Sequence, residues 1–407
     1  MNAGDTAWVL ISAALVMLMT PAVGFFYGGV AGRKNVVNIL AQSFIVLCLV
    51  SIQWFVLGYS LAFGPDVGGL IGNLKWLGLQ GVGLEPNPDY AATIPHQAFM
   101  AFQGMFAVIT PALIIGSFVG RFRAAAFVAF VLLWTTLVYD PIAHWVWGNG
   151  GWLRSLGALD FAGGTVVHIG AGVSALAAAL AVGKSSGTKI GELMPHNVPL
   201  FLLGAILLWF GWFGFNGGSA LAANGLAVNA FVVTGASAAM AGLTWTVVSW
   251  IKTGKVDLIG GATGSVAGLV AITPASGFVG VPAALAIGFG AAIVCYFAVV
   301  FRIKLGLDDT LDVWACHGVG GTWGALATGV FASLAVNPAG ADGLLFGNPT
   351  QLGIQALAVI ATWTFAFGAT FGILKAINAT IGIRVSEAEE RIGLDLMEHG
   401  VEAYTGH

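Results

Sequence analysis

Two histidines stand out because each lies inside a long apolar stretch. His168 follows Asp160 in a segment of small and aliphatic residues at 160–171, and His317 lies in a similar segment at 314–321. An ionisable side chain at membrane depth is costly, so it is by default a candidate functional residue. A neutral imidazole offers one N–H donor and one acceptor nitrogen. Two of them side by side can assist a polar solute or pass a proton.

Three interpretations of this pair fit the residue types. His168 and His317 can be core histidines bonded to backbone carbonyls, or ligands of a haem held between two helices. They can also share a hydrogen bond inside a narrow pore. Haem-bearing membrane bundles often show several such histidines, whereas this chain has one well-placed pair. We therefore favour the pore, and an absent Soret band would exclude the haem.

Aromatic residues in three other apolar segments supply a second kind of chemistry. Phe102 and Phe106 lie one helical turn apart, Trp147 ends another segment, and Phe215 and Ser219 end a third. Aromatic faces attract small cations by about 0.5–2 kcal/mol each, and a hydroxyl accepts from an N–H donor. This combination suits a small cation that carries N–H bonds. An interfacial aromatic belt is the competing interpretation, and we adopt it for Phe102 and Trp145.

The carboxylates next to the histidine segments have a structural explanation. Asp160 stands at the start of its segment, where it can cap free N–H groups and favour the helix dipole. We prefer this role to direct cation ligation, although its field would still attract a cation. Asp308, Asp309 and Asp312 precede the second histidine, and we expect cap and loop roles for them.

Asp140 is a departure from this pattern, because it lies within an apolar segment about two turns before Trp147. We expect it to be hydrogen-bonded, with a hydroxyl or His144 as its partner. A further proton or cation site is the alternative role for this carboxylate.

Composition sets the class of protein. Of the 407 residues, 58% are hydrophobic and 8% are charged, whereas a soluble domain carries roughly 25% charged residues. The chain is therefore predicted to be an all-α polytopic membrane protein. Its cysteines, Cys48, Cys295 and Cys316, show no metal-ligand spacing, and we expect three buried thiols.

Apolar stretches of about 20 residues predict the spans. Eleven are expected, at 7–31, 37–62, 97–120, 124–147, 161–183, 198–218, 226–251, 258–276, 281–301, 314–335 and 352–380. With this count, only Lys75 and Arg154 of the 15 Lys and Arg residues fall on one side. The positive-inside rule then places the N-terminus outside and the C-terminus in the cytoplasm.

The predicted spans divide into two halves and a tail. Residues 24–29 resemble 214–218, and the two histidines fall in spans five and ten. Halves of five spans each, about 5–183 and 198–335, must have opposite orientations, so we expect an inverted repeat with the site at its interface. The helix at about 352–380 is then an addition that completes a domain over 1–383.

Two segments outside the spans are also predicted. The Gly- and Pro-rich segment 64–96 is expected to be an ordered outer loop rather than a domain. Residues 384–407 form a polar cytoplasmic tail, in which Ser386 and Glu389 match a capping box. A short helix ending before Gly400 is expected there.

These residues resemble the Amt/Mep/Rh family of ammonium transporters. The likeness covers about 5–405, and its matching segments are 24–27, 102–107, 141–148, 160–168, 211–220, 312–321 and 393–400. The bacterial and archaeal Amt branch fits better than the Rh branch, because both Trp147 and Ser219 are present.

The resemblance implies a homotrimer in the cell (plasma) membrane, an inner membrane in bacteria, with one pore in each subunit. It implies an outer ammonium site formed by Phe106, Trp147, Phe215 and Ser219. Phe106 and Phe215 also match the stacked rings that gate the pore.

The same resemblance assigns the other residues of the pore. His168 and His317 match the twin histidines, and Asp160 matches the carboxylate that holds the vestibule. The implied mechanism is deprotonation of ammonium and conduction of ammonia, with the proton transferred separately. The protein is expected to be no enzyme, to need no cofactor or metal, and to bind no nucleic acid. A PII-type regulator on the cytoplasmic face is implied, and a sensor of the same fold with little flux is the alternative function.

Overall fold

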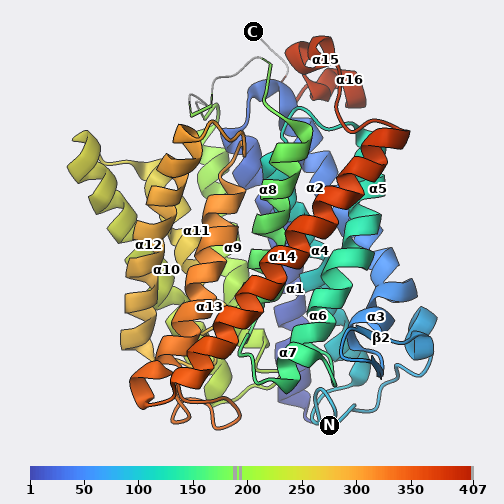
Figure 1. Cartoon of the computed structure of the whole chain (residues 1–407), viewed down its shortest axis with the longest axis vertical. Helices are drawn as coiled ribbons and strands as arrows, with labels where there is room; N and C mark the ends of the chain where they lie inside the picture. The colour runs from blue at the N-terminus through green and yellow to red at the C-terminus, as the bar shows by residue number, and fades with distance from the viewer. Residues whose placement is uncertain (187–189, 192–194, 405–407) are drawn as a thin grey trace.

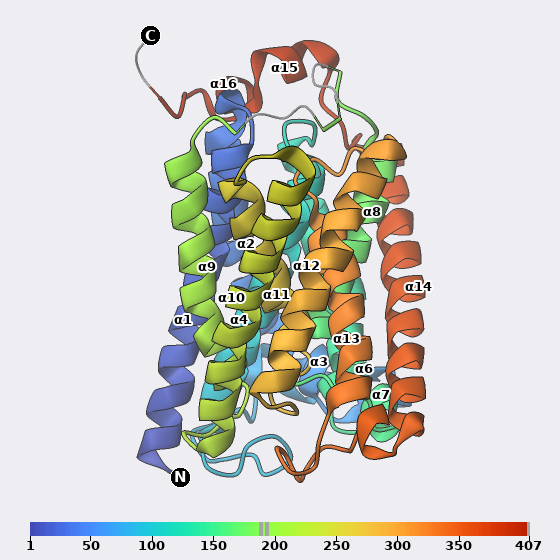
Figure 2. The ribbon, with the colours of Figure 1, turned by 90° about the vertical axis from the view of Figure 1, so that its left-hand side faces the viewer.

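The computed structural model describes residues 1–186, 190–191 and 195–404, and most of these residues are helical. The long helices run side by side along the length of the molecule (Figure 1). The first helix begins at one end of the bundle and the C-terminal tail lies at the other, as a second view confirms (Figure 2). We call these ends the N-terminal face and the tail face.

The helices have the following bounds: α1 (Ala3–Val30), α2 (Val36–Gln53), α3 (Tyr59–Phe63), α4 (His96–Ile114), α5 (Ala124–Trp134), α6 (Asp140–Trp147), α7 (Trp152–Ser155), α8 (Gly170–Val182), α9 (Val198–Gly218), α10 (Gly225–Thr253), α11 (Leu258–Ile272), α12 (Val281–Lys304), α13 (Gly320–Phe331), α14 (Pro349–Thr380), α15 (Glu387–Ile392) and α16 (Leu394–His399). Four π-helical turns join some of them: η2 (Trp54–Gly58), η5 (Thr135–Tyr139), η6 (Gly164–Ile169) and η7 (Trp314–Val319).

The described residues contain nine helical segments long and apolar enough to cross a membrane. They correspond to nine of the predicted spans, which supports a polytopic membrane protein. The other two predicted spans fall on α11, a shorter apolar helix of 15 residues, and on Trp314–Phe331, where η7 continues into α13. The count of eleven therefore stays a prediction.

Glycine allows two of these helices to touch along their length. α1 packs extensively on α9, and a Cβ atom placed on Gly204 would collide with the backbone nitrogen of Phe26. In lipid, helices associate through such close packing rather than through hydrophobicity.

One cysteine prediction is wrong. Cys295 and Cys316 are buried, but Cys48 is exposed on the surface of α2, together with apolar neighbours such as Phe44 and Ile52. An apolar sequence in a membrane protein does not separate a core position from a lipid-facing one.

The N-terminal face carries an ordered loop, as predicted for 64–96. Within it β1 (Asp66–Val67) pairs antiparallel with β2 (Ile71–Gly72). Aromatic packing ties the rest of the loop to the bundle, because Trp76 stacks on Tyr59 with ring centroids 5.5 Å apart.

The tail folds against the tail face as two short helices, where one had been predicted. The capping box of Ser386 and Glu389 is present at the start of α15. Gly393, with φ 110°, separates α15 from α16. The predicted end before Gly400 is confirmed, since α16 ends at His399 and Gly400 is left-handed.

Polar contacts hold this tail in place. Asp395 accepts a hydrogen bond from the Asn38 backbone at 2.8 Å, and Arg384 pairs with Glu390 at 2.9 Å. Burial alone would raise the pKa of Glu390, but hydrogen bonds from Arg384, Ser186 and Ser185 outweigh it and hold that pKa below its ordinary value. Glu390 is therefore ionised at neutral pH, and its contribution is lost only as the pH falls through that lowered pKa.

We expect Glu390→Gln to loosen the tail, because the variant loses its charge-assisted bonds to Arg384 and Ser185. Hydrogen exchange of the amides of 394–399 should accelerate several-fold at neutral pH. Glu387→Gln is the matched control, since Glu387 is exposed and lies 3.7 Å from Arg391. Equal exchange in the two variants would show that Glu390 does not anchor the tail.

Candidate functional site

The two histidines predicted from the sequence meet inside the bundle. The Nδ1 atoms of His168 and His317 lie 3.2 Å apart, and the rings are nearly parallel with centroids 5.3 Å apart. Both side chains are buried. Because one nitrogen must donate and the other accept, the pair shares a single N–H and is most simply two neutral imidazoles of opposite tautomer.

Each histidine lies on a π-helical turn, His168 on η6 and His317 on η7. The two segments approach so closely that a Cβ atom on Gly172 would collide with the backbone of Gly318. A Cβ on Gly321 would lie 3.1 Å from the His168 Cβ. The glycines around the histidines therefore allow the contact between the imidazoles.

Asp160 holds the start of the first of these turns. Its two carboxylate oxygens accept backbone N–H groups from the four residues Gly163, Gly164, Thr165 and Val166, at 2.7–3.2 Å. Its backbone carbonyl accepts the indole N–H of Trp147 at 2.9 Å. Asp160 thus connects the histidine segment with the aromatic residue at the N-terminal face.

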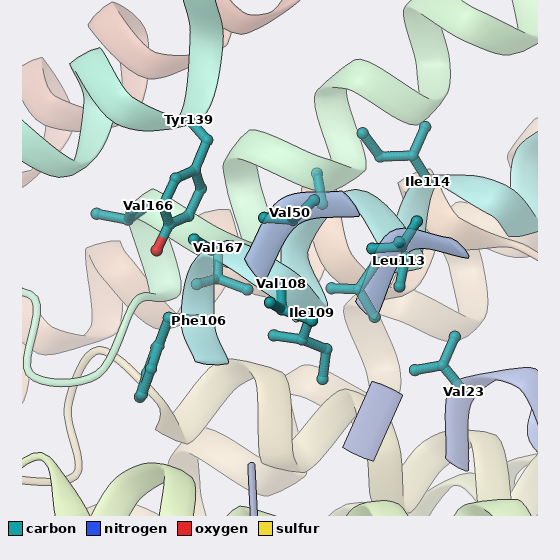
Figure 3. Close-up of a cluster of buried hydrophobic side chains, with 14 of the residues drawn as sticks. Val23, Val50, Phe106, Val108, Ile109, Leu113, Ile114, Tyr139, Val166 and Val167 are labelled. Atoms are coloured by element: carbon teal, nitrogen blue, oxygen red, sulfur yellow. The ribbon is translucent and has the colours of Figure 1, made fainter. Parts of the chain in front are cut away.

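Three aromatic rings lie on the N-terminal side of the histidines. Phe106 and Phe215 lie against each other with centroids 4.2 Å apart, and Trp147 presents its ring to Phe106 at 6.0 Å. Phe215 also stacks on His168 at 5.9 Å. Phe106 lies among the buried side chains of Tyr139, Val166 and Val167 (Figure 3).

Two further residues belong to this stack or border it. Phe102 is fully buried and packs edge-on against Phe106 at 4.9 Å, so its assignment to an interfacial belt is wrong. Ser219 is half-buried at the end of α9, and its hydroxyl donates to the Phe215 carbonyl at 2.8 Å. The hydroxyl oxygen keeps its capacity to accept a hydrogen bond.

A narrow apolar lumen lies below the rings. Its volume is about 10 Å³, about the least that holds one water molecule. Its lining is apolar apart from a few residues with polar groups, which include His168, His317 and Tyr27. His168 Nε2 is buried and has no hydrogen-bond partner in the described part of the chain.

A larger cavity of about 320 Å³ opens beyond His317, toward the tail face. Asp312 lines it and pairs with Arg302 at 2.6 Å. Behind it, Asp309 accepts the backbone N–H of Trp314 at 2.7 Å, which agrees with the predicted cap. Burial and the neighbouring Asp312 raise the pKa of Asp309 to about 7.

Asp140 lies apart from this path. Its carboxylate accepts from the Gln53 amide at 2.8 Å, and the same amide donates to the Thr136 hydroxyl at 3.1 Å. The expected partner was a hydroxyl or His144, and that expectation is wrong. Asp140 does not line the lumen or the larger cavity.

The facing Nδ1 atoms of the two histidines do not hold a metal ion between them. Two trans ligands of one metal ion lie about 4 Å apart, twice a metal–nitrogen bond of about 2 Å. Nδ1 atoms at 3.2 Å leave no room for an ion between them.

Comparison with known proteins agrees with this architecture. A family model described as the Ammonium Transporter Family matches residues 7–404. The chain belongs to this family. It is 52% identical to an Archaeoglobus fulgidus protein named ammonium transporter Amt1, with all of both chains covered.

Solved structures show the same fold. The chain matches the crystal structure of Saccharomyces cerevisiae Mep2 with a TM-score of 0.90 at 36% identity, covering 95% of this chain and 88% of that one. It also matches a structure described as a sensor Amt protein, with a TM-score of 0.89 at 31% identity over 97% and 98% of the two chains. The chain is therefore a multi-pass membrane protein of a transporter family.

We expect Asp160→Ala to destabilise the protein by about 4 kcal/mol or more, because four buried N–H groups lose their acceptor at about 1–3 kcal/mol each. Asp160→Asn keeps one oxygen and should lose less. Thermal unfolding of the purified variants measures the difference. Equal unfolding temperatures for Ala and Asn would contradict the capping role.

Proposed function

We propose that this protein transports ammonium by removing a proton and conducting ammonia past the twin histidines. The observation that carries this proposal is the unpartnered His168 nitrogen in an apolar lumen, directly below the Phe106–Phe215 stack. A lumen of this width and polarity opposes a charged, hydrated ion. Ammonium differs from a metal ion in that it can leave its charge behind as a proton.

Recruitment takes place at the N-terminal face. Trp147, Phe106 and Phe215 present aromatic rings, and the Ser219 oxygen accepts an N–H. Each ring face contributes about 0.5–2 kcal/mol to binding of a desolvated cation. The field of Asp160, near Trp147, adds to the attraction.

Conduction then uses the histidines. Neutral ammonia is both a donor and an acceptor, and it is small enough for the lumen once the rings part. His168 and His317 offer ammonia a hydrogen-bond acceptor and a hydrogen-bond donor. The N–H that the two rings share supplies a separate route for the proton. Transport in this scheme carries charge, although ammonia and the proton cross apart.

The architecture we propose has eleven spans over 1–383, with the N-terminus outside, and a cytoplasmic tail over 384–407. The halves 5–183 and 198–335 form an inverted repeat, and 352–380 adds the last helix. An odd number of spans is supported by the start of α1 at one end of the bundle and the tail helices α15 and α16 at the other (Figure 2). Further support comes from the sequence, where Asp160 and Asp309 stand at the same spacing before His168 and His317.

Assembly and regulation are part of the same proposal. The exposed apolar surface includes Phe231 and Val228 beside Trp8 near the N-terminal face, which suits lipid or the neighbouring subunits of a homotrimer. The folded tail offers a cytoplasmic surface for a PII-type regulator. We propose no cofactor, no metal, no enzymatic activity and no nucleic-acid partner.

A sensor with little flux is the second candidate function. The similarity to a protein described as a sensor Amt protein favours it, and the tail contacts at Lys34 and Asn38 offer a means of signalling from the bundle. Ammonium binding without uptake would establish this alternative.

We expect the double variant His168→Ala, His317→Ala to lose ammonium uptake into proteoliposomes by at least roughly tenfold, since the lumen then lacks its matching groups. Ammonium binding at the outer rings should persist, which tests that the variant is folded. Unchanged ammonium-specific uptake would contradict the histidine role. Absent uptake by the wild-type protein with binding intact would contradict transport itself.

A further inference from the structure

His144 makes two hydrogen bonds at the end of α6 that faces the outer loop. Its Nδ1 lies 2.9 Å from the Ala62 carbonyl oxygen, and its Nε2 lies 2.9 Å from Asp66 Oδ1. The imidazole is completely buried, while the Asp66 side chain is 30% exposed. The contact joins α6 to the loop that carries β1 and β2.

The two contacts depend on which ring nitrogens of His144 carry a hydrogen. The Ala62 carbonyl can only accept, so Nδ1 must carry a hydrogen. Asp66 Oδ1 also accepts the backbone N–H of Gly69 at 2.7 Å, a contact that suits an ionised carboxylate. Nε2 must therefore donate as well. Against an ionised Asp66, both contacts are satisfied only by a ring that carries a hydrogen on each nitrogen, because a neutral ring would satisfy only one of them.

This ion pair lies one helical turn from Trp147, the ring at the outer site. The turn that follows Trp147 packs on the imidazole, since a Cβ atom on Gly148 would lie 2.5 Å from His144 Nδ1. A Cβ atom on Gly150, whose φ is 94°, would lie 2.6 Å from the Asp66 Cβ. Loss of the pair would therefore free both sides of the turn that ends α6.

The loop makes two more contacts on the same segment. The Trp145 indole N–H donates to the Leu70 carbonyl at 2.8 Å, and the Trp152 backbone N–H donates to the Gly69 carbonyl at 3.1 Å. Both acceptors lie between β1 and β2 in the sequence, so the position of this hairpin determines where the end of α6 is held.

Other ionisable groups near α6 do not share in the pair. They are Tyr59 on α3, Tyr139 on η5, Arg154 on α7, His168 on η6 and Asp140 on α6 itself, together with Tyr90, whose hydroxyl donates to the Phe63 carbonyl, and Asp160, whose carboxylate accepts from the backbone at the start of η6. In the described residues none of them is hydrogen-bonded to the His144 ring. Arg154 instead donates to the Trp147 carbonyl at 2.7 Å.

We propose that His144 and Asp66 are positioning residues for the outer ammonium site. The imidazolium–carboxylate pair locks the hairpin onto α6 and thereby holds Trp147 over Phe106. Neither residue touches the ion. This inference rests on the proposed function only in its effect on transport, because the lock itself is a property of the fold.

Asp66→Asn tests the pair with minimal change in shape. At about pH 6 an imidazolium still donates to the Asn oxygen. At about pH 8 a histidine with no facing carboxylate is neutral. The Asn oxygen then faces the lone pair of His144 Nε2. Alternatively, the amide rotates and its oxygen loses the hydrogen bond from the Gly69 N–H. The KM for ammonium should rise roughly tenfold at the higher pH, with kcat little changed, and should be unaffected at the lower pH.

The wild-type protein should show no such rise between the two pH values at equal ammonium concentration. Asp89→Asn is the matched control, because Asp89 is an exposed carboxylate on the same loop. An Asp66→Asn variant whose KM follows the wild-type profile would overturn the proposal. A fall in kcat alone would overturn it too, since that places the defect beyond recruitment.

Hydrogen exchange gives a measurement that does not depend on transport. After correction for intrinsic rates, amides of 66–72 should be protected at both pH values in the wild-type protein and only at about pH 6 in Asp66→Asn. Equal protection at the two pH values in the variant would overturn the lock. If exchange behaves as expected while the wild-type protein carries no ammonium, the lock stands and the proposed function fails.

Discussion

The contact between the His168 and His317 imidazoles is the constraint on which the rest of the structure depends. Two polar rings at 3.2 Å inside an apolar bundle require two backbone segments to approach more closely than ordinary helices do. Gly172 and Gly318 permit this approach. At the π-helical turns on both segments, the backbone departs from regular α-helix geometry, and this departure accommodates the contact.

Buried carboxylates make this arrangement stable. Asp160 satisfies four backbone N–H groups at the start of η6, and Asp309 performs the same task with Trp314 before η7. Without them, each turn would leave donors unpaired in a region with little water, at about 1–3 kcal/mol for each group. The same Asp160 holds Trp147, so the histidine turn and the outer ring are fixed together.

The chemistry of the site was easier to predict than its surroundings. His168, His317 and Asp160 stand out in any apolar sequence, because ionisable groups there demand an explanation. Phe102 and Cys48 were misassigned because an apolar segment does not reveal which side faces lipid and which faces the core. The Gln53 partner of Asp140 lies far along the chain in another helix, and no local pattern identifies it. His144 was predicted only as a candidate partner of Asp140, because its actual partner, Asp66, lies 78 residues away in the sequence.

The central claim is that only a cation able to give up a proton crosses this pore. Potassium is the direct comparison, because it is a small monovalent cation without a proton to lose. Currents should be recorded from the wild-type protein on a supported membrane under equal gradients of ammonium and potassium. We predict a current with ammonium and none above background with potassium. A potassium current comparable to that of ammonium would contradict the account.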